Sequence, residues 1–284
     1  MRHLILLVLP PLIALATVGC TTTQGTAPAT LPAAATPSPL GVTSQDLAGE
    51  LVVCAASSLT DAFTEMKTAF ESEHPNVTIA YNFAGTPTLR TQLEQGALAD
   101  IFASANQQQM EQAAQSGVIE GSPVIFTSNK LVVITPSDEE GVRELSDLAN
   151  DGVRLLLALE DVPVGVYARD SIDKMAQSGQ FGANFSEEVL SNVVSEEPNV
   201  RQVVAKVMLG EANAGIVYVT DITGDAVGKV RTIQIPDQYN VLAVYPMAQV
   251  KNAKNSPAAQ AFIEFVRSPQ GQAILAKYGF GGIP

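Results

Sequence analysis

The sequence predicts an α/β protein in which strands and helices alternate along the chain. Short apolar runs at residues 51–56, 100–105, 130–134 and 214–218 have the length of buried strands. The segments between them carry apolar residues at helical spacing, which implies parallel strands flanked by helices. Most strands also end in Ser, Thr, Asn or Pro residues, and a helix begins at once.

Length and charge restrict the class of protein. The chain has 284 residues and a formal net charge of −13, enough for one large or two medium domains. This acidic balance argues against nucleic acid and anionic membrane surfaces as partners. It permits one small anion, because salt screens the distant charges and a local dipole site can outweigh them. Such a site should be largely uncharged.

The N-terminus reads as a targeting segment. Residues 1–19 form a predicted signal peptide, in which Arg2 and His3 precede an apolar run. The small residues before Cys20 resemble a bacterial lipobox, so we expect Cys20 to be lipidated, with ordinary cleavage as the alternative. Residues 20–48, rich in Thr, Ala, Pro and Ser, form the expected flexible linker. The protein is therefore expected outside the cytoplasm, as a membrane-anchored lipoprotein or a periplasmic protein.

The first predicted helix follows Ser58. It places Leu59, Phe63, Met66 and Phe70 on one face, and Ser58-x-x-Asp61 has the form of a capping box. Cys54 is expected to be a buried packing residue because it sits inside the preceding apolar strand. With Cys20 lipidated, no second thiol remains to form a disulfide.

The second helix is expected to begin at Thr86-Pro87, with Thr86 as the N-cap and Pro87 at the first helical position. It should end near Gly96. A third strand at 100–105 and a helix at 107–116 follow.

Two lobes are expected, because the chain passes to a second set of elements near residue 130 and returns after residue 239. Lobe I comprises residues 49–130 plus 246–284, and lobe II comprises residues 131–245. The elements expected in lobe II are strands at 153–159, near 193 and at 214–218, and helices from about 165 and at 200–209. A site between two lobes suits a ligand that is enclosed and then released by a hinge motion.

Several kinds of site are missing from the sequence. After the signal peptide the chain has one histidine, His74, so no His/Cys metal cluster and no Ser-His-Asp triad is expected. No Gly-x-Ser-x-Gly elbow or phosphate-binding glycine motif occurs. A pair of carboxylates remains possible, although Glu196-Glu197 reads most simply as solvated loop charge. We therefore expect no cofactor, no direct protein ligand to a metal, and a binding protein instead of an enzyme.

Hydrogen-bond donors gather where strands meet helices. Four such junctions carry donor groups: Ser57-Ser58, Gly85-Thr86, Pro163-Val164-Gly165 and Asn199-Val200. Tyr218 ends a fifth strand. Capping alone would explain any one of them. Together they predict a site that holds a small anion with helix N-termini and hydroxyl groups.

At these residues the chain resembles the extracytoplasmic molybdate-binding proteins that feed ABC transporters. The resemblance covers residues 51–280 and is carried by six motifs: AASSLT at 55–60, FAGTPTL at 83–89, ADIFASA at 99–105, VPVGVYA at 162–168, GIVYVTD at 215–221 and KYGF at 277–280. It implies the two-lobed type II periplasmic binding protein fold, each lobe a mixed sheet flanked by helices.

The resemblance also implies a site. Ser58 would donate its hydroxyl and N–H, with Ser57 beside it, and Tyr218 would donate its phenol. Val164 and Val200 would donate backbone N–H groups. Thr86 takes the place of a serine, and the following Pro87 departs from the family pattern by removing an N–H donor.

The implied ligand is molybdate, with tungstate as a close mimic, delivered to the membrane permease of an ABC transporter by a monomer that touches the membrane only through Cys20. Three alternatives stay open: a receptor for sulfate, phosphate or an organic acid, a secreted enzyme that uses Asp or Glu on a small anion, and a surface adhesion or structural protein.

Overall fold

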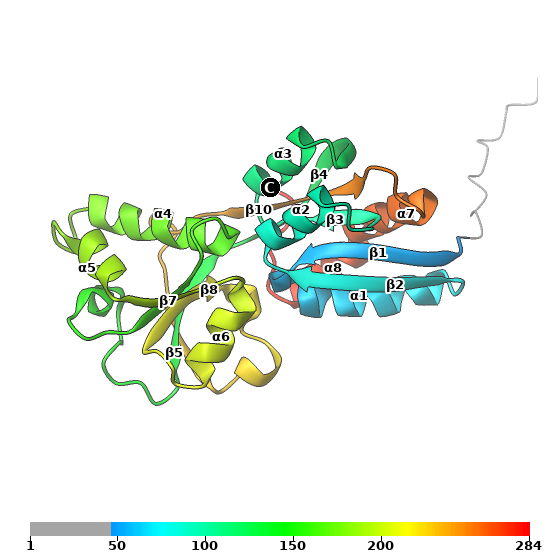
Figure 1. Ribbon diagram of the computed structural model, residues 1–284. Coiled ribbons are helices and arrows are strands. Elements are labelled where there is room, and N and C mark those ends of the chain that lie inside the picture. Colours follow the sequence, from blue (N-terminus) through cyan, green and yellow to red (C-terminus); the bar gives the residue numbers. More distant parts are fainter. Residues whose placement is uncertain (1–46) are drawn as a thin grey trace, which may run out of the picture. The chain divides into compact units, whose positions relative to one another are not determined.

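The computed structural model describes residues 47–284. It contains two five-stranded mixed sheets, called sheet A (order β2-β1-β3-β10-β4) and sheet B (order β7-β6-β8-β5-β9), each flanked by helices (Figure 1). The predicted α/β class with two mixed sheets is confirmed. The signal peptide at 1–19, Cys20 and almost all of the linker lie outside the described residues.

In sheet A the parallel strands end at the edge where the first helices begin, which we call its carboxyl edge. Its strands are β1 (Gly49–Ala56), β2 (Val77–Ala84), β3 (Ile101–Ala103), β4 (Ile119–Asn129) and β10 (Ala243–Val250). β1 pairs in parallel with β2 and β3, whereas β10 runs antiparallel to β3 and β4. The carboxyl ends of β1, β2 and β3 therefore meet at one edge.

Helices cover both faces of sheet A: α1 (Thr60–Glu73), α2 (Thr86–Glu94), α3 (Gln107–Gln115), α7 (Ser256–Arg267) and α8 (Pro269–Lys277). The side chains of β1 alternate between two buried clusters. Val53 belongs to the cluster that contains Phe63 and Phe262 of α1 and α7, and Cys54 belongs to the cluster that contains Leu89 of α2. Cys54 is thus a buried packing residue, as expected, and burial raises the pKa of its thiol.

Sheet B repeats this plan. Its strands are β5 (Leu131–Pro136), β6 (Leu155–Ala158), β7 (Val193–Glu197), β8 (Ala214–Tyr218) and β9 (Val230–Gln234), with helices α4 (Pro163–Gln177), α5 (Phe185–Ser191) and α6 (Val200–Met208). β6 runs parallel to β7 and β8, so their carboxyl ends also share one edge. Four short 3₁₀ helices complete the elements: η1 (Ser57–Leu59), η2 (Leu145–Ala149), η3 (Val219–Asp221) and η4 (Gly224–Ala226).

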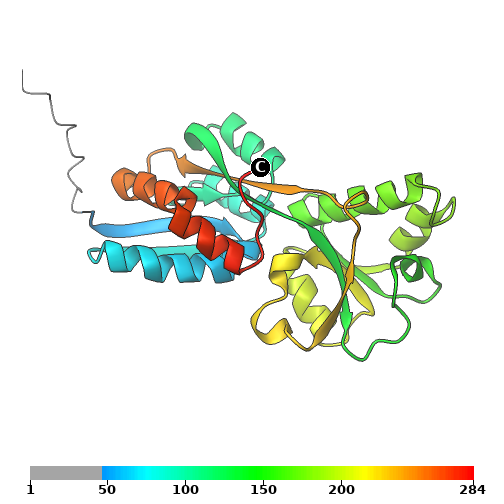
Figure 2. The ribbon, with the colours of Figure 1, turned by 180° about the vertical axis from the view of Figure 1, so that it is seen from behind.

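Two connections join the sheets and run side by side (Figure 2). One is the single residue Lys130 between β4 and β5, and the other is residues 235–242 between β9 and β10. The Asn240 side chain links them, since its Oδ1 accepts from the Leu131 N–H and its Nδ2 donates to the Leu131 carbonyl. The strands of sheet A lie within 49–129 and 243–250, so β10 begins three residues before the crossing expected at residue 246.

The capping predictions at the first two helices were wrong. No side-chain cap precedes α1, because Ser58 faces Tyr245 and Asp61 faces Arg201 and Thr223. The N-cap of α2 is Gly85, and Thr86 is the first helical residue. In both places a contact far along the chain takes the side chain that local spacing assigns to a cap. Within residues 47–284 no helix combines the length and apolar character needed to span a membrane.

Candidate functional site

A small cavity, walled mostly by buried residues, lies where the carboxyl edges of the two sheets meet. Its volume is about 10 Å³, close to the minimum that one water molecule needs. Its walls come from both sheets: Ala56, Ser57, Ser58, Ala84, Gly85, Thr86, Ala105, Val162, Pro163, Val164, Val200 and Tyr218. None of these residues carries a charge.

Helix starts point at this cavity because the strands before them run parallel. η1 follows β1 and α2 follows β2 from sheet A, whereas α4 follows β6 and α6 follows β7 from sheet B. The first N–H groups of a helix have no partner within it, and the helix dipole adds partial positive charge there. All six residues predicted to bind the ligand line the cavity. Their contact with a ligand remains a prediction.

The phenol hydroxyl of Tyr218 is a buried hydrogen-bond donor at the cavity without a well-formed acceptor. Its side chain is only 1% exposed, and its hydroxyl makes no well-formed hydrogen bond with the described residues, although the Tyr245 hydroxyl lies near enough to affect its pKa. Burial raises its pKa well above the usual range, so the phenol keeps its proton. A buried unpaired hydroxyl costs about 1–3 kcal/mol. The cavity therefore lacks an acceptor at this point.

Two of the three other hydroxyls in the cavity wall, those of Ser58 and Thr86, have hydrogen-bond partners. The Ser58 Oγ lies 3.0 Å from the Tyr245 hydroxyl, and the Thr86 Oγ1 accepts a hydrogen bond of 3.3 Å from the Ala105 N–H. A hydroxyl can accept and donate at once. Thr86 can therefore accept from Ala105 and still donate its hydrogen into the cavity.

The two walls of the cavity approach each other at Gly85. A Cβ atom added to Gly85 would lie 2.1 Å from the Pro198 carbonyl oxygen, on the loop between β7 and α6. No side chain fits in that space, so a glycine is required for this approach of sheet A elements to sheet B elements.

The cation nearest in sequence to the cavity is neutralised by two carboxylates. Arg201 follows Val200 at the start of α6, and its Nη2 lies 2.8 Å from the Asp61 carboxylate of α1. Its Nε lies 3.0 Å from the carboxylate of Asp221, which is fully buried. The Thr223 hydroxyl also donates to Asp61. This ion pair joins helices from the two sheets and leaves no net positive charge for a ligand.

Comparison with known proteins identifies the family. The model of the bacterial extracellular solute-binding proteins matches residues 51–281. The chain belongs to this family. It is 35% identical to the molybdate-binding protein ModA of Mycobacterium tuberculosis over 82% of this chain and 85% of that protein.

Two solved structures share the fold of this solute-binding protein. The periplasmic molybdate-binding protein of Azotobacter vinelandii superposes with a TM-score of 0.70 at 19% identity, covering 81% of this chain and 98% of that one. The sulfate-binding protein SubI of Mycobacterium tuberculosis gives 0.73 at 16% identity, covering 82% and 87%. At these identities the likeness concerns the fold alone.

Sequence reasoning missed the residues behind the cavity. Tyr245, Asn129 and Arg201 lie on separate elements. Tyr245 contacts Ser58, whereas Asn129 and Arg201 bind residues next to the cavity, and no local sequence motif indicates these contacts. The interpretation of Glu196-Glu197 as solvated loop charge was wrong for Glu197, whereas Glu196 is exposed, although it lies in β7 and not in a loop. Glu197 ends β7, is buried, and accepts from the Lys206 ammonium at 2.6 Å, whereas Glu196 pairs with Arg169.

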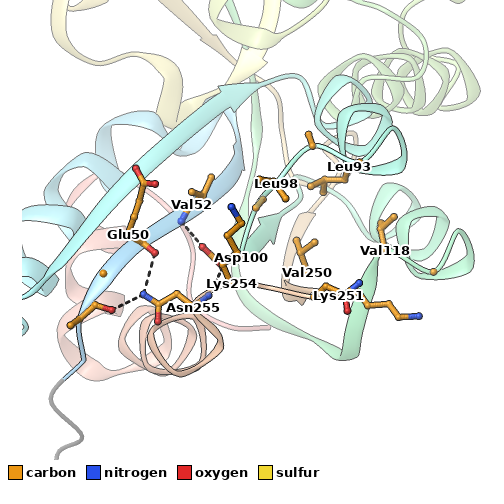
Figure 3. A pocket seen from close by; sticks show the side chains of 17 residues that line it. Glu50, Val52, Leu93, Leu98, Asp100, Val118, Val250, Lys251, Lys254 and Asn255 are labelled. Carbon is orange, nitrogen blue, oxygen red and sulfur yellow. Dashed lines mark hydrogen bonds between the residues drawn. The ribbon is translucent and has the colours of Figure 1, made fainter.

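A wider hollow of about 670 Å³ lies at the other end of β1 (Figure 3). Its wall includes the buried Asp100, whose two carboxylate oxygens accept from the backbone N–H groups of Val52 and Asn255, each at 2.8 Å. Lys251 and Lys254 also line it. Because its buried polar group is an anion with both oxygens occupied, this hollow is a poor place for a desolvated anion. In the part of the chain that the structure describes, no group of His, Cys, Asp or Glu could hold a metal ion.

The pH dependence of stability tests the buried carboxylate beside the cavity. Burial, opposed by the charge of Arg201, raises the pKa of Asp221 from 3.8 to about 7. The folded chain then keeps this proton between about pH 4 and 7, where the unfolded chain releases it, so the wild type loses stability as pH rises through that window. Relative to Asp221→Asn, the free energy of unfolding should fall by at most about 1.4 kcal/mol per pH unit and level off above pH 7.

Urea unfolding of both proteins from pH 4.5 to 8 measures this difference, and the other titrating groups cancel between them. Parallel stability curves would mean that Arg201 keeps Asp221 ionised throughout.

Proposed function

We propose that this solute-binding protein captures molybdate between its two sheets and delivers it to the membrane permease of an ABC transporter. One observation carries the proposal: a buried cavity without any charged side chain is walled by helix starts and by a phenol that has no acceptor. An oxyanion supplies the acceptors that such a cavity lacks.

Neutral donors suit a dianion in a protein of net charge −13. Hydrogen bonds from N–H and O–H groups to a charged acceptor are stronger than those between neutral groups. They also avoid the cost of removing a counter-charge from water. The four helix starts add their dipoles without changing the formal charge of the cavity.

The cavity chemistry also supports a choice among oxyanions. Hydrogen phosphate carries a proton that needs an acceptor, and no carboxylate lines the cavity. Sulfate has the same charge as molybdate but shorter bonds, so the two would be separated by size. Tungstate has nearly the shape and charge of molybdate and should bind as well. The named molybdate-binding relative, similar over more than four fifths of both chains, supports molybdate as the first ligand to test.

Binding requires the two sheets to move apart and close again. The cavity volume of about 10 Å³ holds about one water molecule, so a four-oxygen anion needs a wider cavity. The two connections held by Asn240 are the natural hinge, and the Arg201–Asp61 ion pair would form on closing. Closure also removes water, which strengthens each hydrogen bond to the anion.

The remaining expectations follow from this role. The protein acts outside the cytoplasm as a binding protein without catalysis, and it works as a monomer. Cys20 would carry the lipid that keeps it near its permease, although that residue lies outside the described part of the chain.

Thermal unfolding with molybdate, tungstate, sulfate and phosphate in turn tests the proposal. At 100 times its dissociation constant a ligand adds about 2.7 kcal/mol to the stability, which is several degrees for a domain of this size at roughly 2–4 °C per kcal/mol. We expect molybdate and tungstate to raise the melting temperature, with little effect of the other two. A higher melting temperature with sulfate or phosphate alone would mean that this anion, and not molybdate, is the ligand. No change with any of the four anions would contradict an oxyanion site.

Tyr218→Phe separates binding from folding. Because the Tyr218 hydroxyl has no partner in the structure, its removal should leave the free protein as stable as the wild type or slightly more stable. The same change should weaken molybdate binding about 10- to 100-fold, as expected for one hydrogen bond to a charged group. Calorimetric titration measures the affinity. Tyr239→Phe, which removes a hydroxyl that donates to Gln180 away from the cavity, is the matched control. Unchanged affinity in Tyr218→Phe would remove this residue from the site.

A further inference from the structure

A chain of buried hydrogen bonds runs from Asn129 to Ser58. The Asn129 Nδ2 lies 3.3 Å from the Tyr245 hydroxyl, which in turn lies 3.0 Å from the Ser58 Oγ. The same Nδ2 donates to the Thr220 Oγ1 at 2.8 Å. Asn129, Tyr245 and Ser58 are all at least 95% buried. Water therefore has little access to rearrange these bonds.

The orientation of the Asn129 amide determines which group donates and which accepts in this series of hydrogen bonds. Its Oδ1 accepts from the Lys130 N–H at 2.9 Å, so its other atom must be the NH₂ group. The two hydrogens of that group go to Thr220 and Tyr245. The oxygen of Tyr245 is therefore an acceptor toward Asn129. Its single hydrogen is available for Ser58, which lies at hydrogen-bond distance, whereas the neighbouring Tyr218 hydroxyl does not meet hydrogen-bond geometry.

We infer that Asn129 and Tyr245 are positioning residues that make Ser58 a donor toward the bound oxyanion. Tyr245 donates to the Ser58 Oγ, and the hydrogen of Ser58 is then directed into the cavity. This inference rests on the proposed function, because it assigns a direction to a hydroxyl of that same site.

The Thr86 and Tyr218 hydroxyls of the cavity also have a hydrogen to give. Thr86 accepts from the Ala105 N–H, and Tyr218 has no acceptor, so each also has a hydrogen free for the cavity. With Ser58 directed by Tyr245, all three hydroxyls can donate to the ligand at the same time. A cavity of this polarity fits an oxyanion without protons better than one that carries a proton, since no carboxylate lines it.

A double-mutant cycle on molybdate affinity tests the inference. Tyr245→Phe keeps the ring in the core and removes the hydrogen that Ser58 accepts. If Tyr245 acts through Ser58, the affinity should fall about tenfold, the factor that corresponds to one modest hydrogen bond of about 1.4 kcal/mol. In a Ser58→Ala background the same change should cost less than about twofold, since the group that it orients is already gone.

Calorimetric titration of the wild type, both single variants and the double variant supplies the cycle, with Tyr239→Phe as a control for the loss of a buried phenol hydroxyl. An equal loss in both backgrounds would show that Tyr245 acts through the general structure, and no loss in the single variant would show that it does not act on binding. Either result overturns the inference while the wild type still binds molybdate. Failure of the wild type itself to bind would overturn the proposed function instead.

Discussion

The structure depends on one electrostatic constraint: donors from two sheets converge on a cavity that contains no acceptor for them. Parallel strands bring the starts of η1, α2, α4 and α6 to the same place, and their N–H groups cannot be satisfied within the helices. The Tyr218 hydroxyl adds a buried donor with no partner. An arrangement of this kind costs free energy when empty, and an anion relieves the cost. The free energy that the unpaired donors cost the free protein is recovered when the anion binds, and this raises the binding affinity.

Charge is kept out of the cavity although charged residues lie close by. Arg201 stands next to Val200 in the chain, yet its guanidinium faces Asp61 and Asp221. If this cation faced the ligand directly, any anion would be attracted, including those with the wrong size or protonation state. With the charge paired, discrimination depends on the number and direction of neutral donors. The same ion pair links α6 to α1, so it also favours the closed arrangement of the two sheets.

The order of elements was predictable because it follows from local patterns. Residues 214–218 form β8 as the apolar run indicated, and the helix starts after β1, β2 and β7 lie within a residue or two of the places suggested by Ser58, Thr86 and Asn199. The positions that line the cavity were also within reach, because strand ends of a parallel sheet share an edge and the family motifs mark those ends.

The use of individual side chains was not predictable from spacing. Ser58-x-x-Asp61 has the pattern of a cap, but Asp61 binds Arg201, which lies 140 positions further along the chain. Glu197 looked like a loop charge, yet β7 carries it into the core beside Lys206. The chain from Asn129 through Tyr245 to Ser58 joins three distant segments. Such contacts depend on the packing of the two sheets, and no local pattern contains that information.

The most direct test is a crystal structure of the protein grown with molybdate, with anomalous data collected at the molybdenum absorption edge. The account predicts one strong anomalous peak between the two sheets, within hydrogen-bond distance of the Ser58, Thr86 and Tyr218 hydroxyls and of backbone N–H groups at Val164 and Val200, with no charged side chain in contact. A peak in the hollow beside Lys251 and Lys254, or one ringed by lysine or arginine side chains, would contradict it.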